Sequence, residues 1–220
     1  RSSAASDVYK RQRLYKANDM VKADCGGCNG CSRCCHGMGN SIILDPYDVY
    51  RMTTGMGKSM QELLAASVEL NVVDGVILPN LKMQGTEEAC AYLDEEGRCS
   101  IHPYRPGICR LFPLGRYYEN GGFSYFLQTG ECAKENRSKI KVSKWIDTPD
   151  LTRNQQFTLQ WHDLLHAMEE RLTGEDEGKQ REENLLLLRL FYLLPYEGTI
   201  DFYTQFTERM EHWNGQNGQI

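Results

Sequence analysis

A dense run of cysteines near the start of this chain constrains its fold more than any other feature. The run reads Cys25-Gly-Gly-Cys28-Asn-Gly-Cys31-Ser-Arg-Cys34-Cys35. Each Cys-x-x-Cys step lets neighbouring thiolates converge on one centre, and bacterial ferredoxins hold corners of a cubane with steps of this kind. The interleaved glycines disfavour a helix or a strand. The run therefore predicts a wrapped loop that binds metal through thiolates.

Four later cysteines extend the set of candidate ligands. Cys90 and Cys99 flank a predicted hairpin, so pairing of its strands would bring their sulfurs near each other. Adjacent Cys34 and Cys35 cannot easily face one mononuclear ion, and eight or nine thiolates suffice for two four-ligand sites. The candidate metal ligands are Cys25, Cys28, Cys31, Cys34, Cys35, Cys90, Cys99, Cys109 and Cys132.

The cysteine usage also indicates a compartment. Nine cysteines cannot all pair with one another, and those between residues 25 and 35 are too close together to form unstrained bridges. In a chain of 220 residues, nine cysteines stay well below the content of secreted disulfide scaffolds. We expect a reducing, cytoplasmic location with metal-bound thiolates.

Composition narrows the possible partners. A hydrophobic content of 40% with 25% charged residues is typical of a globular protein. The net charge of −5 argues against non-specific nucleic-acid binding, which usually needs a basic face. No stretch approaches the roughly 20 apolar residues of a membrane helix. We expect no nucleic acid and no membrane anchor, and the sequence leaves any protein partner or substrate unknown.

Local signals divide the chain into three parts. Residues 1–12 resemble a translated adapter or assembly scar and are left out of the fold prediction. Residues 13–147 form the expected cysteine-cluster metal-binding domain, and residues 148–220 form a helical C-terminal region. Asp45 caps an expected helix that ends at Gly55 or Gly57. A second helix begins with a capping box at Ser59 and continues through about Glu69.

Hairpins and helices are expected to alternate after these two helices. The predicted hairpins are 71–79, 91–102 turning at 94–97, and 115–128 turning at 119–122. From Thr148 a helix begins, a charged linker follows at 172–178, and two more helices are expected near 180–194 and 199–213. We therefore predict an α+β fold, with a small cysteine-rich module organised around metal and a helical C-terminal portion.

The cysteine spacings match a known pattern. The segment Cys28-x-x-Cys31-x-x-Cys34-Cys35 is followed by Cys90, Gly97-Arg98-Cys99-Ser-Ile-His, Arg105-Pro106 and Cys109-Arg110-x-Phe112-Pro113. Over roughly Ala23 to Cys132, this resembles the YkgJ-like CxxCxxCC cysteine-cluster family. The resemblance implies a zinc- or iron-chelating protein, commonly described as containing an iron–sulfur cluster. Flagellin lysine N-methylase shares the signature, which implies a protein-modifying enzyme as an alternative. Cys25 is additional to the short motif.

An iron–sulfur cluster, in the first instance 4Fe-4S, is the expected cofactor. Zinc sites usually use two separated knuckles instead of one continuous run, but a zinc-stabilised interaction module stays open. The cluster would have a redox, cluster-handling or structural role. Arg105 and Arg110, beside the anionic centre, would offset its charge or donate hydrogen bonds to sulfur.

Other polar residues have simpler interpretations. His36 or His102 is a possible extra ligand or neighbour of the cluster. His162 and His166 have helical spacing but lack the glutamate of zinc proteases, so a polar helix face is expected. Asp45 and Asp48 are explained by capping. Because the sequence has no nucleotide fingerprint, phosphate loop or nucleophile elbow, no catalytic residue is assigned and enzymatic activity stays open.

Overall fold

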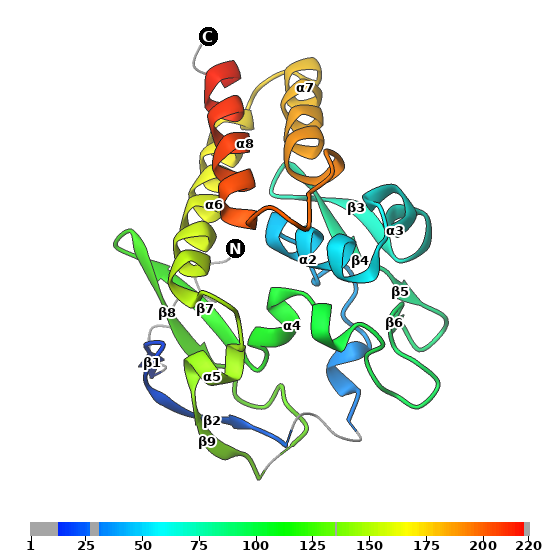
Figure 1. Ribbon diagram of the computed structural model, residues 1–220, viewed down its shortest axis with the longest axis vertical. Coiled ribbons are helices and arrows are strands. Elements are labelled where there is room, and N and C mark those ends of the chain that lie inside the picture. Colours follow the sequence, from blue (N-terminus) through cyan, green and yellow to red (C-terminus); the bar gives the residue numbers. More distant parts are fainter. Residues whose placement is uncertain (1–12, 27–30, 135, 218–220) are drawn as a thin grey trace.

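Small antiparallel hairpins and short helices occupy one end of the molecule, and longer helices occupy the other (Figure 1). The computed structural model describes residues 13–26, 31–134 and 136–217. The strands are β1 (Leu14–Tyr15), β2 (Met20–Asp24), β3 (Val68–Val73), β4 (Val76–Leu81), β5 (Met83–Gln84), β6 (Ala89–Cys90), β7 (Leu114–Glu119), β8 (Gly122–Leu127) and β9 (Ser138–Lys141). The mixture of hairpins and helices confirms the α+β prediction.

Short helices lie among the hairpins, and the longer helices form the other end of the molecule (Figure 1). Short turns of 3₁₀-helix are η1 (Arg33–Cys35) and η2 (His102–Tyr104), and a π-helical turn is η3 (Arg189–Leu193). The α-helices are α2 (Pro46–Met56), α3 (Met60–Ala66), α4 (Gly107–Leu111), α5 (Val142–Ile146), α6 (Leu151–Leu172), α7 (Glu177–Leu188) and α8 (Phe202–Asn217). Within the described ranges, none of them is long and apolar enough to cross a membrane.

Capping residues set the starts of α2 and α3 as predicted. The Asp45 carboxylate accepts a hydrogen bond from the Asp48 backbone N–H at 2.8 Å, and the Asp48 carboxylate accepts one from the Asp45 N–H at 3.2 Å. Ser59 and Glu62 form the second capping box. The predicted extension to Glu69 is wrong, because the chain from Val68 onward pairs with β4 and leaves the helix at Ala66.

Two of the predicted hairpins are confirmed: the first is longer than predicted, at 68–81, and the second lies one residue earlier than predicted, at 114–127. Strand β3 pairs with β4 around the turn between Val73 and Val76. Strand β7 pairs with β8 around the turn between Glu119 and Gly122, and β1 adds a third strand to that sheet. Strand β2 pairs with β9, so the segment just before the cysteine run is anchored to residues near 140.

The hairpin predicted at 91–102 forms only its turn. The Asp94 side chain accepts a hydrogen bond from the Arg98 N–H at 2.7 Å, and one isolated bridge joins Leu93 to Cys99. The strands predicted on either side do not form there. A shorter pair, β5 with β6, precedes the turn and carries Cys90. Cys90 and Cys99 are therefore held by two different local structures.

The larger hydrophobic core crosses the division predicted at 147/148. It combines α2, α3, β3 and β4 with α6, α7 and α8, and Phe157, Phe202 and Phe206 lie near its centre with mutual ring distances of 4.8 to 5.8 Å. The buried Tyr192 hydroxyl donates to the Leu44 carbonyl at 3.0 Å. A smaller core joins β2, β7, β8 and α5. The domain boundary itself stays a prediction.

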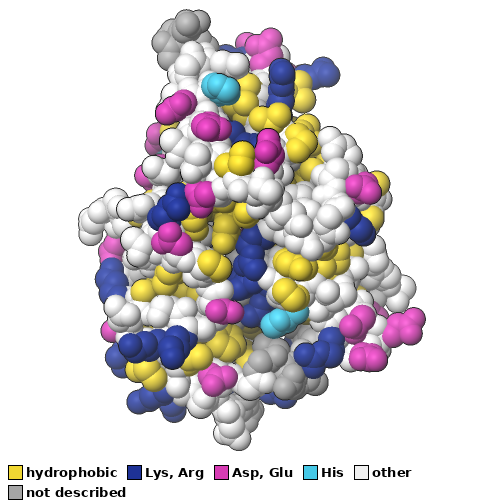
Figure 2. Space-filling model, in the orientation of Figure 1, with side chains coloured by type: hydrophobic (Ala, Val, Ile, Leu, Met, Phe, Trp, Pro, Cys, Tyr) yellow, Lys and Arg dark blue, Asp and Glu magenta, His cyan; other side chains and the backbone are white. Residues whose placement is uncertain are grey.

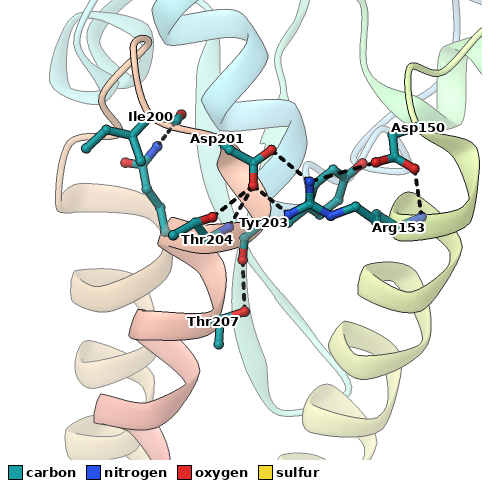
Figure 3. Close-up of polar contacts among 8 residues, drawn as sticks. Asp150, Arg153, Ile200, Asp201, Tyr203, Thr204 and Thr207 are labelled. Atoms are coloured by element: carbon teal, nitrogen blue, oxygen red, sulfur yellow. Dashed lines mark hydrogen bonds and ion pairs between the residues drawn. The ribbon is translucent and has the colours of Figure 1, made fainter.

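An ion pair between Arg153 and Asp201 joins the beginnings of α6 and α8 (Figure 3). Arg153 on α6 makes two contacts with the Asp201 carboxylate, at 3.3 and 2.7 Å. Asp201 in turn accepts a hydrogen bond from the Thr204 N–H at 3.0 Å and so caps α8. These contacts hold the beginning of α8 against the beginning of α6.

Candidate metal centre

Six cysteines that are distant in sequence line one cavity of about 330 Å³. They come from the loop and turn around η1, from the β6 region with the turn after it, and from α4. Figure 1 shows the segment that carries η1 beside α4 and β6. The lining cysteines are Cys31, Cys34, Cys35, Cys90, Cys99 and Cys109.

Backbone contacts hold the three cysteine-bearing segments in place. An isolated bridge pairs His36 with Ala89, and the Gly37 N–H donates to the Glu88 carbonyl at 2.9 Å. These bonds tie the end of the cysteine run to β6. The Gly107 N–H at the start of α4 donates to the Asp48 carboxylate at 2.7 Å. Asp48 therefore caps α2 and also docks the helix that carries Cys109.

Most of the other side chains around the cavity are apolar. They include Met38, Ile42, Leu81, Met83, Ile101, Ile108, Phe112, Leu114 and Trp145. Burial among them raises the pKa of Cys90, Cys99 and Cys109. These thiols keep their protons at neutral pH unless a cation compensates the thiolate charge. A bound metal supplies that compensation, since thiolate ligands are deprotonated by the ion they bind.

Cys34 and Cys35 behave differently from the other thiols. The pKa of Cys34 is lowered to about 6, chiefly by a hydrogen bond from the Cys35 thiol and to a smaller extent by the charge of the Arg105 guanidinium. The same contact raises the pKa of Cys35. Cys34 is therefore largely a thiolate near neutral pH even without metal. A thiolate is the reactive form of cysteine, both as a nucleophile and as a metal ligand.

The cysteine sulfurs are spread around the cavity wall. Among the residues at 13–26, 31–134 and 136–217, no three His, Cys, Asp or Glu side chains are gathered as the ligands of a single ion are. Cys28 lies outside the described residues. Cys25, just after β2, and Cys132, in the loop after β8, do not line the cavity, although Glu131 next to Cys132 does.

The two predicted arginines have different surroundings. Arg105 lines the cavity; its charge contributes to the lowered pKa of Cys34 and partly offsets the burial that raises the pKa of Cys99. Arg110 is buried and donates to the carbonyls of Pro103 at 2.8 Å and Asp147 at 2.7 Å. Arg110 thus holds the loop that carries Arg105 against the end of α5.

The histidines are also separated in space. His102 lines the cavity, whereas His36 takes part in the backbone bridge beside it. His162 stacks on Tyr118 with ring centroids 3.8 Å apart, and His166 lies 3.5 Å from the Glu170 carboxylate. Sequence reasoning missed the apolar part of the wall, such as Trp145, because no local spacing links that side chain to the cysteines.

Comparison with known proteins agrees with the resemblance seen in the sequence. Residues 27–133 match the model of the CxxCxxCC family, whose description is "Putative zinc- or iron-chelating domain". The matched segment contains every cysteine of the chain except Cys25. Neither a search of curated proteins nor a search of solved structures found a match.

Proposed function

We propose that the cysteine cavity holds an iron–sulfur cluster, in line with the match of residues 27–133 to the model of the CxxCxxCC family. The observation that carries the proposal is that six cysteines line a single cavity of about 330 Å³. A tetrahedral zinc ion with sulfur ligands at about 2.3 Å needs no such space. A cluster of several iron and sulfide atoms needs both a cavity and ligands that are spread around it.

We assign the ligands of the cluster to the six cavity cysteines, of which a 4Fe-4S cluster takes four. When bound, an iron–sulfur cluster accepts and donates single electrons. Apolar side chains surround the partly exposed cysteines, and Arg105 offsets part of the negative charge of the thiolates. The surroundings of the sulfurs and the nearby positive charge both tune the reduction potential of such clusters.

We infer a redox or cluster-handling role in a reducing compartment such as the cytoplasm. Seven of the described cysteines form no disulfide bridge: Cys31, Cys34, Cys35, Cys90, Cys99, Cys109 and Cys132. Free thiols persist in reducing compartments, whereas oxidising ones favour bridges. The same thiolates also support folding, because a bound metal would cross-link the η1 loop, the β6 region and α4.

Metal analysis of anaerobically purified protein tests this proposal. We expect a brown protein that contains iron and acid-labile sulfide in equal amounts. A colourless protein that contains zinc and no sulfide would show that the site binds zinc and not an iron–sulfur cluster. Protein that contains neither metal would refute metal binding altogether.

A matched pair of cysteine variants tests the site assignment. Cys31→Ser removes a cavity ligand, and we expect it to lose most of the bound metal. Cys25→Ser makes the same change outside the cavity, and we expect its metal content to stay close to that of the parent protein. Equal losses in the two variants would show that the cavity does not define the site.

A further inference from the structure

The outer face of the β2–β9 pair carries a cluster of exposed lysines. The inner face of the same pair supplies the buried Val21 and Ala23 to the smaller core. The side chains that alternate with them point outward and are mostly basic, and α5 adds one more exposed lysine directly after β9. This basic face consists of Met20, Lys22, Lys139, Lys141 and Lys144, all of them exposed.

The charge at this end of the molecule is opposite to that of the whole chain. Residues 13–24 and 136–147 carry seven basic and three acidic side chains, whereas the chain has a net charge of −5. Residues 151–217, which include α6 to α8, carry twelve acidic and six basic side chains. Figure 2 shows Lys and Arg side chains at the lower left of the molecule, where Figure 1 places α5 and the β2–β9 pair. An acidic partner is therefore attracted to this end and repelled by the other.

Two of the lysines face each other across the strand pair. Lys22 lies directly opposite Lys139, and like charges in this position destabilise an antiparallel pair. Within the described ranges, none of the lysines of the basic face forms an ion pair. In β3–β4 and β7–β8, no residue faces another of the same charge. Lysines that only protect a strand edge need not face one another, so a partner that supplies carboxylates explains this arrangement better.

The acidic residues at the two ends of β2 do not neutralise the lysines. The Asp19 carboxylate accepts a hydrogen bond from the Lys16 backbone N–H at 2.7 Å. The Asp24 carboxylate accepts hydrogen bonds from the Gly26 N–H and the Ser138 hydroxyl, both at 3.0 Å. These contacts hold both carboxylates at the ends of the strand and leave the lysine ammonium groups to the solvent.

An exposed methionine within the basic face favours a protein as the partner. Met20 is 47% exposed and pairs with Lys141. Protein interfaces combine an apolar centre, in which methionine is enriched, with a polar rim. Surfaces that bind single-stranded nucleic acid add aromatic side chains on which bases stack, and neither β2 nor β9 contains an aromatic residue.

The basic face also lies next to the cysteine cavity. Leu114 lines the cavity and belongs to the smaller core together with Val21 and Ala23. Trp145, which follows Lys144 on α5, lines the cavity and packs against the same core. A protein docked on the basic face would therefore be separated from the cavity by the side chains of this core.

We propose that the basic face docks an acidic protein. Carboxylates of the partner pair with Lys22, Lys139 and Lys141, and an apolar side chain of the partner packs on Met20. Complementary charges mainly speed association and fix its orientation, and exposed ion pairs are screened by salt. The complex is thus transient and salt-sensitive, and its formation depends on this surface and not on which metal the cavity holds.

Fluorescence anisotropy with the full-length, metal-loaded protein tests the chemistry of the partner. The probe is a labelled peptide of repeated Glu-Leu-Glu-Glu units, which supplies both carboxylates and an apolar side chain. The comparison probes are the same peptide with lysine in place of glutamate, a single-stranded DNA oligonucleotide, and vesicles of phosphatidylcholine and phosphatidylserine. We expect the acidic peptide to bind about tenfold more tightly than any of these at low salt, and added salt to weaken it. Tighter binding of the oligonucleotide or the vesicles would overturn the proposal.

A matched pair of charge reversals locates the docking surface. Lys139→Glu places a carboxylate opposite Lys22, so we expect the melting temperature to rise while the acidic peptide binds several-fold more weakly. Lys58→Glu makes the same change on an exposed residue between α2 and α3, and it should leave binding of the peptide unchanged. Both variants should keep the metal content of the parent protein. Equal affinity of the two variants for the peptide would refute the basic face as the docking site.

Discussion

At the scale of single residues, Gly55 shows how one missing side chain helps to position the cysteine cavity. It lies inside α2, where glycine is normally unfavourable by about 1 kcal/mol relative to alanine. The Tyr104 ring fills the space beside it. Because Tyr104 belongs to η2, this contact fixes the turn that carries His102, which lines the cysteine cavity.

We expect Gly55→Ala to destabilise the fold by about 1–3 kcal/mol, since overpacking against Tyr104 outweighs the gain in helix propensity. Gly215→Ala is the matched control, because Gly215 is also helical and no atom lies within 4 Å of the added carbon. That variant should be unchanged or stabilised by up to about 1 kcal/mol. Urea denaturation measures both. A Gly55→Ala protein as stable as Gly215→Ala would contradict the packing argument.

At the scale of elements, local chemistry was predictable and tertiary pairing was not. The starts of α2 and α3 follow from Asp45 and Ser59, because a cap depends only on residues three positions away. The two-residue strands β5 and β6 have no periodicity to detect. Similarly, spacing marked the cysteines as candidate ligands, but the apolar wall around Trp145 comes from distant segments.

The end of the α7–η3 helix shows an element whose stability depends on a distant side chain. The buried Arg209 on α8 donates to the carbonyls of Leu190, Leu194 and Pro195 at 2.7 to 2.9 Å. It also lies 3.6 Å from the centre of the Tyr196 ring. These carbonyls are left over where the π-helical turn ends, so a charged donor from another helix satisfies them.

Arg209→Met should therefore destabilise the protein by about 3 kcal/mol or more, because it leaves several buried carbonyls without a donor. Arg189→Met makes the same change on the exposed side of η3 and should alter stability by less than about 0.5 kcal/mol. Chemical denaturation of the two variants gives the comparison. Equal stabilities would mean that water replaces Arg209 at no cost.

At the scale of the whole molecule, the proposed cluster and the C-terminal helices are linked by one core. Cys90, Cys99 and Cys109 pack against the same hydrophobic cluster that contains Trp161 and Trp213 from α6 and α8. In zinc-finger peptides metal binding contributes about 10–16 kcal/mol, as much as the net stability of about 5–15 kcal/mol typical of a domain. A comparable contribution here would make the folding of the entire core depend on the metal.

Removing the metal should therefore unfold the cysteine module and the C-terminal helices in a single transition, although the sequence alone suggests a boundary at 147/148. We expect a chelator to lower the melting temperature, with far-ultraviolet circular dichroism and tryptophan fluorescence changing together. The same chelator saturated with metal beforehand should have no effect. Retention of the helical signal after the cysteine module has unfolded would show two independent units, because helices α6–α8 would then be stable without the shared core.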